Sequence, residues 1–551
     1  IMSHGYNPYL SEWSPFHGGM YAIIEAVAKI VAAGGDHTRI RLSLQEYFER
    51  LEDNPSRWGK PFAALLGAYT AQTALNLPSI GGKDSMSGTF NGIDVPPTVV
   101  AFAVNTVDVD KVISPEFKKA GSKVVFLTLP MDERYMPDFA ELDKNYARIH
   151  ELIDEGKILS AHTVRGGGLC EAISKMCFGN MLGFAFDESV TMDEMFAPAY
   201  GSHVLEIDAD EDVESLFAGT QCKYIGKTQE DRHISIGNVS ISLNEALDRW
   251  TGALESVFPT RVSAKGGSPK EYIYRADNKR VGYSTARPKV LIPVLPGVNG
   301  EYDAAKAFED AGANPEIIIF KDMNPSDVRD SLDTLAAAIE EAQIIMLPGG
   351  VGIDSEPESG GTPLTTVFMN NKVADAVMDF LNNRDGLILG VGSGFSALLK
   401  LGLLPYGEIR PECDIKMGLA PNTIGRHVSS IVNTKVVSNN SPWFMFTDIG
   451  DVYTLPISHA GGRFIASEDD IANMAKSGQI ATQYVDLKGQ PTLETPFNPT
   501  GSVEAIEGIT SPDGRILGRL GHPERMSKNT LINIPGKREM AIFKGAVTYF
   551  K

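Results

Sequence analysis

The chain has 551 residues, of which 70 are Asp or Glu and 50 are Lys or Arg, giving a formal net charge of −20. Such a charge repels a phosphate backbone, and no apolar run approaches the roughly 20 residues of a membrane span, so we expect neither nucleic acid nor a membrane as a partner. The four cysteines lack the paired spacing of a zinc site, which favours reduced thiols and a cytoplasmic location.

The first 108 residues contain two helical patterns and extended segments, which we interpret as one domain. Ser14 followed by Pro15 is typical of a helix cap and first turn, and the apolar spacing after them predicts a helix over 20–33. Glu25 lies on this helix four residues before a lysine, a spacing typical of a surface ion pair. The other elements expected here are strands over 39–44 and 98–107 and a helix over 60–75.

A polar motif with two glycines lies between the second helix and the last strand of this domain. Gly81 and Gly82 are followed by Lys83, Asp84 and Ser85, which brings backbone N–H groups, an ammonium and a hydroxyl close together. That combination suits a phosphate group or a magnesium nucleotide, although the spacing is not that of a Walker loop. A polar hairpin turn has the same composition, so both interpretations stay open.

Residues 109–263 mix strands and helices in a pattern typical of an α+β domain. A triple glycine at 166–168 opens a helix, which suits either an anion cradle or a turn that lets the helix pack closely. Residues 264–287 are rich in Gly, Lys and Arg without an apolar pattern, so we interpret them as a linker. The expected elements are strands over 123–127, 203–207 and 235–243 and a helix over 146–155.

Residues 288–551 alternate between strand and helix. This alternation predicts a doubly wound parallel sheet with helices on both faces, whose functional residues gather at the carboxyl ends of the strands. The strands are expected over 290–294, 317–320, 344–347, 387–390 and 516–520, and the helices over 303–311, 332–342, 373–381 and 396–401.

A glycine-rich elbow joins the strand at 387–390 to the helix at 396–401. A strand–elbow–helix of this kind presents a nucleophile at the edge of the sheet, but here the elbow residue is Gly392, which has no side chain. Gly349 and Gly350 follow a neighbouring strand and suit an oxyanion hole, or simply a tight turn. His522 and Glu524 follow the last strand and suit a base and the group that orients it.

Together these motifs resemble phosphoribosylformylglycinamidine synthase, and the resemblance to its C-terminal half covers nearly the whole chain. It implies an incomplete N-terminal-like synthetase domain over 1–108, a C-terminal-like synthetase domain over 109–263, a linker over 264–287, and a class I glutamine amidotransferase-like domain over 288–551. The synthetase domains would have the α+β fold of aminoimidazole ribonucleotide synthase. The motifs that carry the resemblance are residues 14–19, 80–87, 296–303, 401–409, 422–427 and 508–514.

The resemblance implies ATP and Mg²⁺ as cofactors, with Gly81, Gly82, Lys83, Asp84 and Ser85 at the nucleotide and Glu25 at the metal. Thr163 and Gly166 stand in a loop where many relatives carry aspartate. The implied substrate is formylglycinamide ribonucleotide, and the implied partner is an N-terminal synthase half or a separate chain, since the chain is expected to be a piece of a longer enzyme.

In the amidotransferase domain the resemblance implies a Cys-His-Glu triad. His522 and Glu524 match its base and orienting group, and Gly349 and Gly350 match its oxyanion turn, but Gly392 stands where the family has cysteine. Residues 459–463 read His-Ala-Gly-Gly-Arg, without the family's glutamate. Because no acyl-enzyme forms without a thiolate, we expect an ammonia-dependent ATP-driven carbon–nitrogen ligase. The alternative is a catalytically dead protein that serves as a binding or regulatory module.

Overall fold

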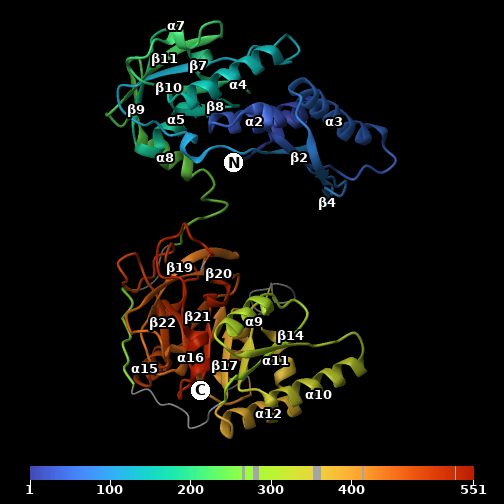
Figure 1. The fold of residues 1–551 in the computed structure, drawn as a ribbon, viewed down its shortest axis with the longest axis vertical. Coiled ribbons are helices and arrows are strands. Elements are labelled where there is room, and N and C mark those ends of the chain that lie inside the picture. Colours follow the sequence, from blue (N-terminus) through green and yellow to red (C-terminus); the bar gives the residue numbers. More distant parts are fainter. Residues whose placement is uncertain (263–266, 277–284, 351–360, 412–414, 528) are drawn as a thin grey trace. The chain divides into compact units, whose positions relative to one another are not determined.

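The computed structural model describes residues 1–262, 267–276, 285–350, 361–411, 415–527 and 529–551. They form two compact units, Ile1–Ser256 and Val257–Lys551 (Figure 1). Every residue of the first unit is described. Within the described residues no helix is long and apolar enough to cross a membrane.

The first unit begins with a four-stranded sheet in the order β1-β6-β2-β3, in which β2 and β3 are parallel and the other pairs antiparallel. Helix α2 packs against β1, β6 and α3, and nearly all of its residues are buried. A short hairpin, β4–β5, lies outside this sheet. The elements are β1 (Met2–Gly5), α1 (Pro8–Trp13), α2 (Pro15–Ala32), β2 (Arg41–Tyr47), α3 (Pro55–Leu75), β3 (Ser79–Lys83), β4 (Thr89–Phe90), β5 (Ile93–Asp94) and β6 (Thr98–Val104).

The start of α2 confirms the predicted cap. The Ser14 hydroxyl accepts a hydrogen bond from the backbone N–H of His17 at 3.4 Å, and Pro15 occupies the first helical turn, where no backbone N–H is needed.

Helices α2 and α3 approach closely because α3 has a glycine at the contact. A Cβ built on Gly67 would lie 1.8 Å from the carbonyl oxygen of Phe16 in α2, whereas a Cβ on Gly59 of the same helix meets nothing within 4 Å. We therefore expect Gly67→Ala to destabilise this unit by about 1–3 kcal/mol through overpacking. Gly59→Ala should instead stabilise it by up to about 1 kcal/mol through helix propensity.

Hydrogen exchange of peptides from α2 and α3 measures the local opening free energy in each variant and in the unmodified chain. Equal protection in the two variants would contradict a backbone contact at Gly67.

The second half of this unit is a seven-stranded sheet in the order β13-β12-β9-β11-β7-β10-β8. The single strand predicted over 235–243 is wrong, because Gly237 turns the chain at φ +54° and makes the hairpin β12–β13. The elements are β7 (Lys123–Leu127), α4 (Phe139–Asp154), β8 (Ile158–Thr163), α5 (Gly168–Asn180), β9 (Gly183–Phe186), α6 (Met192–Phe196), β10 (His203–Ile207), α7 (Val213–Leu216), β11 (Cys222–Gln229), β12 (His233–Ile236), β13 (Val239–Ser242) and α8 (Leu243–Thr251).

The described part of the second unit is organised around a nine-stranded sheet in the order β15-β14-β16-β17-β24-β23-β22-β19-β20, with a separate β18–β21 pair. The strands are β14 (Lys289–Val294), β15 (Asn314–Ile319), β16 (Ile344–Leu347), β17 (Leu387–Val391), β18 (Gly418–Ala420), β19 (Val428–Val436), β20 (Val452–His459), β21 (Arg463–Ile465), β22 (Ile480–Tyr484), β23 (Ile506–Thr510) and β24 (Ile516–Arg519). The helices are α9 (Glu301–Asp310), α10 (Pro325–Glu341), α11 (Thr362–Phe368), α12 (Asn371–Asn382), α13 (Ser393–Lys400), α14 (Leu403–Tyr406), α15 (Glu468–Lys476) and α16 (Ile542–Tyr549).

Helices cover both faces of the parallel half of this sheet, which confirms the doubly wound prediction (Figure 1). Successive residues of a strand point to opposite faces. Ile345 and Ile388 accordingly pack with α10, α12 and α13 on one face, and Ile344 and Leu389 pack with α9 and α16 on the other. The parallel pairing ends at β24, because β23, β22, β19 and β20 continue the sheet in antiparallel fashion, which the sequence did not indicate.

The described residues of the predicted linker belong to the second unit and are hydrogen-bonded to the rest of it. The backbone N–H of Tyr272 donates to Gln483 at 3.1 Å, and its hydroxyl donates to Glu504 at 3.0 Å. The break between the units falls at 256/257, before the predicted start of the linker at 264.

Candidate functional site

The turn between β17 and α13 has the backbone of a strained elbow. Gly392 has φ +57° and ψ −116°, a conformation that residues with a side chain rarely adopt. Its N–H donates to the carbonyl oxygen of Arg519 in β24 at 3.1 Å, which ties the elbow to the neighbouring strand. The position therefore has the backbone expected where an α/β fold presents a nucleophile, with no side chain on it.

A side chain at this position would point at the histidine predicted as the base. A Cβ built on Gly392 lies 3.8 Å from Nε2 of His522 and 3.6 Å from its Cε1. The Cα of Gly349 is also 3.6 Å from that Cβ, and among the described residues outside the elbow itself none comes closer. The structure thus brings together Gly392, His522 and Gly349, which come from three separate loops at one edge of the sheet.

His522 and Glu524 form a buried pair. Nδ1 of His522 lies 2.6 Å from Oε1 of Glu524, and the two residues are 4% and 6% exposed. Because Nδ1 donates to the carboxylate, Nε2 is the ring nitrogen that faces the elbow. Among the described residues neither Nε2 of His522 nor Oε2 of Glu524 has a hydrogen-bond partner. The pair has the arrangement of a base held by its orienting carboxylate.

Gly349 and Gly350 follow β16 and lie against residues 297–299. The carbonyl oxygen of Gly349 accepts from the N–H of Asn299 at 2.9 Å, and Gly350 forms an isolated bridge with Val298. A Cβ on Gly349 would lie 3.2 Å from Cε1 of His522, whereas one on Gly350 would lie 2.3 Å from a backbone oxygen. Gly349 therefore borders the site itself, and Gly350 allows the close backbone packing beside it.

A buried ion pair that sequence reasoning missed supports the histidine loop. Arg519 at the end of β24 and Glu507 in β23 are fully buried, with 3.1 Å between Nη2 and Oε2. Oε1 of Glu507 also accepts the N–H groups of Leu520 and Gly521, at 3.2 and 2.6 Å. The sequence did contain a signal for this pair, namely one charged residue in each of two otherwise apolar strands. Such residues are buried only when they are paired.

His459 is a second histidine near the base. Burial and the nearby charge of His522 lower the pKa of His459 to about 3, so its ring is neutral at physiological pH. Both ring nitrogens are buried without a partner among the described residues. Asn422 holds this segment, since its side chain donates to the carbonyl of His459 at 2.8 Å and accepts from the N–H of Gly462 at 3.0 Å.

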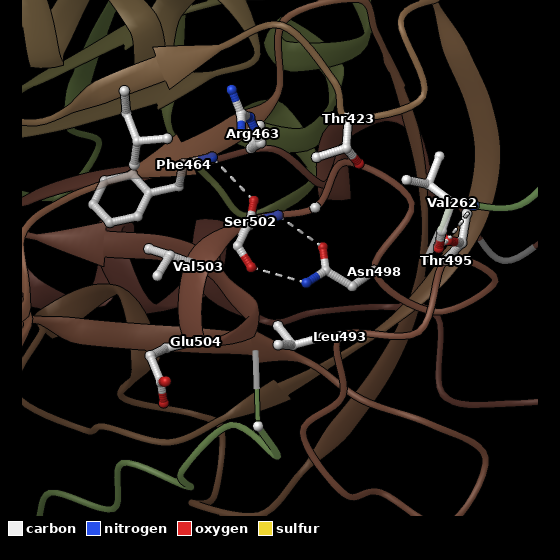
Figure 2. Close-up of a pocket in the computed structure, with 13 residues that line it drawn as sticks. Val262, Thr423, Arg463, Phe464, Leu493, Thr495, Asn498, Ser502, Val503 and Glu504 are labelled. Atoms are coloured by element: carbon white, nitrogen blue, oxygen red, sulfur yellow. Dashed lines mark hydrogen bonds between the residues drawn. The ribbon is translucent and has the colours of Figure 1, made fainter. Parts of the chain in front are cut away.

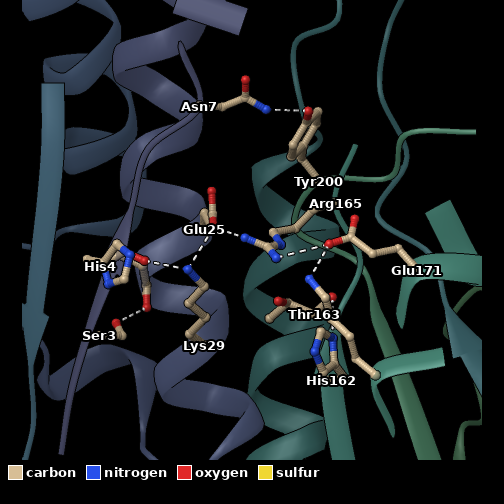
Figure 3. Close-up of polar contacts among 12 residues, drawn as sticks. Ser3, His4, Asn7, Glu25, Lys29, His162, Thr163, Arg165, Glu171 and Tyr200 are labelled. Carbon is tan, nitrogen blue, oxygen red and sulfur yellow. Dashed lines mark hydrogen bonds and ion pairs between the residues drawn. The ribbon is translucent and has the colours of Figure 1, made fainter. Parts of the chain in front are cut away.

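Figure 3 shows the surroundings of Glu25 in the first unit. The predicted ion pair is present, with Lys29 Nζ 2.7 Å from Glu25 Oε1, but Glu25 is buried rather than on the surface. Arg165 adds a second cation at 3.3 Å from the same oxygen and also binds Glu171 at 3.1 Å. No group of three or more His, Cys, Asp or Glu able to hold a metal ion occurs among the described residues. Glu25 is thus paired with cations, and the residues around it do not fit a metal site.

Residues Gly81 to Lys83 belong to β3, an exposed strand parallel to β2. The polar hairpin-turn interpretation is therefore wrong, because these residues are extended. Asp84 and Ser85 follow the strand, and the N–H of Ser85 donates to the carbonyl of Glu46 at 3.1 Å. Glu25 forms its ion pairs with Lys29 and Arg165, so neither of these pairs joins it to the residues expected at the nucleotide.

The second unit also contains a cavity of about 440 Å³, shown in Figure 2. Its lining includes Arg463, Glu504 and the buried Ser502, whose hydroxyl accepts from the N–H of Phe464 at 3.0 Å. Asn498 donates to the Ser502 carbonyl at 2.9 Å. None of the residues at the elbow or the histidine loop lines this cavity, so it is separate from the candidate site.

The similarity to known proteins lies in the second unit, which contains the elbow at Gly392. A family model described as a CobB/CobQ-like glutamine amidotransferase domain matches residues 287–550. Phosphoribosylformylglycinamidine synthase subunit PurQ of Methanococcus maripaludis is 32% identical over an alignment of 286 residues, which covers 48% of this chain and 97% of that protein.

Two solved structures from Thermotoga maritima show weaker similarity. The structure of PurLQS is 24% identical with a TM-score of 0.35 and covers 48% of this chain and 100% of its own. The structure of PurL complexed with ATP is 14% identical with a TM-score of 0.37 and covers 51% of this chain and 48% of its own.

Proposed function

The chain belongs to the phosphoribosylformylglycinamidine synthase family, and we propose that it works there as an ATP-dependent carbon–nitrogen ligase whose own glutaminase has lost its nucleophile. The reaction would convert formylglycinamide ribonucleotide to the amidine of purine biosynthesis. Its nitrogen would come from free ammonia or from the glutaminase of a partner.

One observation carries this proposal. A side chain at Gly392 would contact His522 Nε2, because the Cβ position is only 3.8 Å away, yet the residue there is glycine. His522 and Glu524 can hold and move a proton, but they supply no group that forms an acyl intermediate with glutamine. The hydroxyl of Ser393 belongs to the first residue of α13, beyond the elbow, and is not expected to replace the thiol.

The nucleotide side of the reaction would fall to the first unit. Gly81, Gly82 and Lys83 present an exposed strand, and Asp84 and Ser85 follow it, so these residues would contact ATP. Magnesium does not fit the described residues at Glu25, because Lys29 and Arg165 already bind that carboxylate. We infer that metal ligands come from an N-terminal synthase half or a partner chain.

An exposed apolar face supports such a partner. Residues 58, 62, 65 and 69 of α3 recur at helical spacing and so lie on one face. They are Trp58, Phe62, Leu65 and Tyr69, all between 45% and 66% exposed. A contiguous apolar face of this kind marks a surface that another protein covers. Its apolar character favours a second synthetase half over a nucleic acid, because a phosphate backbone is bound by basic side chains.

The test is ADP release with ATP and formylglycinamide ribonucleotide on the longest natural form of the chain, with its partner half present. We expect ammonium to support turnover and glutamine to give none. Turnover with glutamine, abolished by His522→Ala, would contradict the loss of the nucleophile.

A catalytically dead binding module is the second candidate, and the cation-paired state of Glu25 favours it. It predicts no ADP release with either nitrogen source, even with the partner half. Binding of formylglycinamide ribonucleotide by calorimetry, without turnover, would then establish it over the ligase.

A further inference from the structure

The cavity of about 440 Å³ in the second unit is lined by a cation that the described residues leave without a counter-ion (Figure 2). This cation is Arg463 of β21, whose Nε donates to the carbonyl of Pro421 at 3.1 Å. Within the described part of the chain, neither Nη1 nor Nη2 of Arg463 has a hydrogen-bond partner. The bond to Pro421 therefore orients the guanidinium and leaves its outer edge of N–H groups available.

Other polar side chains of the lining already have partners within the protein. The side chain of Asn498 donates to the carbonyl of Ser502 at 2.9 Å. Oε2 of Glu504 accepts from the hydroxyl of Tyr272 at 3.0 Å. Arg463 is thus the charged group of the lining that a ligand can pair with.

Two segments that line the cavity are tied together by one buried hydroxyl. Oγ of Ser502 accepts from the N–H of Phe464 at 3.0 Å and lies 3.3 Å from the carbonyl oxygen of Gly462, the residues on either side of the arginine. Beyond Ser502 the backbone is strained, since Glu504 and Ala505 have φ +49° and +55°. Such strain persists only where the surrounding structure holds it, and it is common at ligand sites. The cavity is therefore formed before a ligand enters, which lowers the cost of binding.

The lining defines the chemical class of the ligand. Two parallel N–H groups on the edge of a guanidinium match the two oxygens of a carboxylate. Leu493 and Val503 add apolar, partly buried side chains to the same cavity. The negative charge of Glu504 disfavours a ligand with more than one negative charge. A volume of this size suits a small molecule, because ligand pockets range over about 300–1,000 Å³.

We propose that this cavity binds a small monocarboxylate, whose two oxygens accept from Nη1 and Nη2 of Arg463. Its apolar body packs against Leu493 and Val503. The site is distinct from the candidate site at the elbow, because neither Gly392 nor His522 lines the cavity. Binding makes and breaks no covalent bond, and it does not depend on the proposed ligase activity.

The test uses 4-fluorobenzoate as the probe and follows its ¹⁹F signal in the presence of the full chain. We expect saturable broadening of the signal. The probe 4-fluorobenzamide has the same shape without the charge and should bind at least about tenfold more weakly, because it offers one acceptor oxygen. No saturable binding of the benzoate, or equal binding of the amide, would overturn the site. Tighter binding of 4-fluorophenyl phosphate would overturn the choice of a monocarboxylate.

A matched pair of arginine substitutions tests the cation. Arg463→Gln removes the guanidinium and should weaken binding of the benzoate at least about tenfold. Arg410→Gln changes an arginine that pairs with Glu408 outside the lining and should leave binding unchanged. Arg463→Lys keeps the charge but should recover only part of the binding, because an ammonium lacks the planar pair of donors. Equal binding by Arg463→Gln and the unmodified chain would overturn the assignment.

A third substitution tests the position and leaves Arg463 in place. Val503→Phe reduces the cavity and should abolish the saturable broadening. Hydrogen exchange of peptides over 462–465 and 498–505 shows whether the variant is folded, and Leu493→Phe replaces it if those peptides exchange faster. Unchanged probe binding in a folded variant would place the probe elsewhere and overturn the site. Probe binding by a chain without ligase activity would keep this site and overturn the proposed function.

Discussion

Gly392→Cys is expected to introduce a thiol that iodoacetamide alkylates at neutral pH at least about ten times faster than an ordinary cysteine, because a neighbouring histidine lowers the pKa of a thiol. The Cβ would lie 3.8 Å from His522 Nε2, which places the sulfur within reach of the ring. The side chain must accept a φ of +57°, at a cost of about 1–3 kcal/mol that strained sites of this kind tolerate. Peptide mass spectrometry after timed labelling measures the rate.

The matched controls are Ser393→Cys, one residue beyond the elbow, and Gly392→Cys combined with His522→Ala. Both should react at the rate of an ordinary thiol. The native Cys177 and Cys222 provide a slow internal standard, since burial raises the pKa of each to about 12. Equal labelling of Gly392→Cys with and without His522 would contradict the geometry of the site.

Arg519→Met is expected to destabilise the second unit by about 3–5 kcal/mol, because it leaves Glu507 as a buried charge without its cation. Lys306→Met, which breaks an exposed pair 3.3 Å from Asp310, should cost less than about 1 kcal/mol. Hydrogen exchange of peptides from β17 and β24 measures the local opening free energy in both variants.

A double variant separates charge from hydrogen bonding at the same place. Glu507→Gln with Arg519→Met removes both charges but keeps an oxygen for the N–H groups of Leu520 and Gly521. It should recover at least half of the stability lost in Arg519→Met. A double variant as unstable as the single one would show that the pair supports the loop through packing rather than charge.

The sequence predicted the parallel half of the second unit well because its strands are continuous apolar runs ended by glycine or proline. The strand predicted over 344–347 has the bounds of β16, and the helix predicted over 332–342 overlaps α10, which begins earlier, at Pro325, and ends at Glu341. The antiparallel half was missed because β19 and β22 contain buried polar residues such as Thr434 and Gln483. Residues of these types are also common in loops, so the two segments lack the apolar pattern of a strand.

The candidate site was only partly predictable. Gly392 and His522 could be named because local turn signals mark both, although 130 residues separate them. The Arg519–Glu507 pair and the position of His459 depend on which strands become neighbours, and no local pattern encodes that. Likewise Glu25 was assigned its lysine four residues away, whereas Arg165, which lies 140 residues along the chain, was recognisable only in the folded unit.

The most direct measurement of the central claim is glutamate release from isotopically labelled glutamine by the unmodified chain with its synthetase partner, ATP and formylglycinamide ribonucleotide. The absence of a side chain at Gly392 predicts no release above a blank without protein and no difference between the native chain and His522→Ala. Glutamate release that requires His522 would contradict the account, because it would mean that another group supplies the nucleophile.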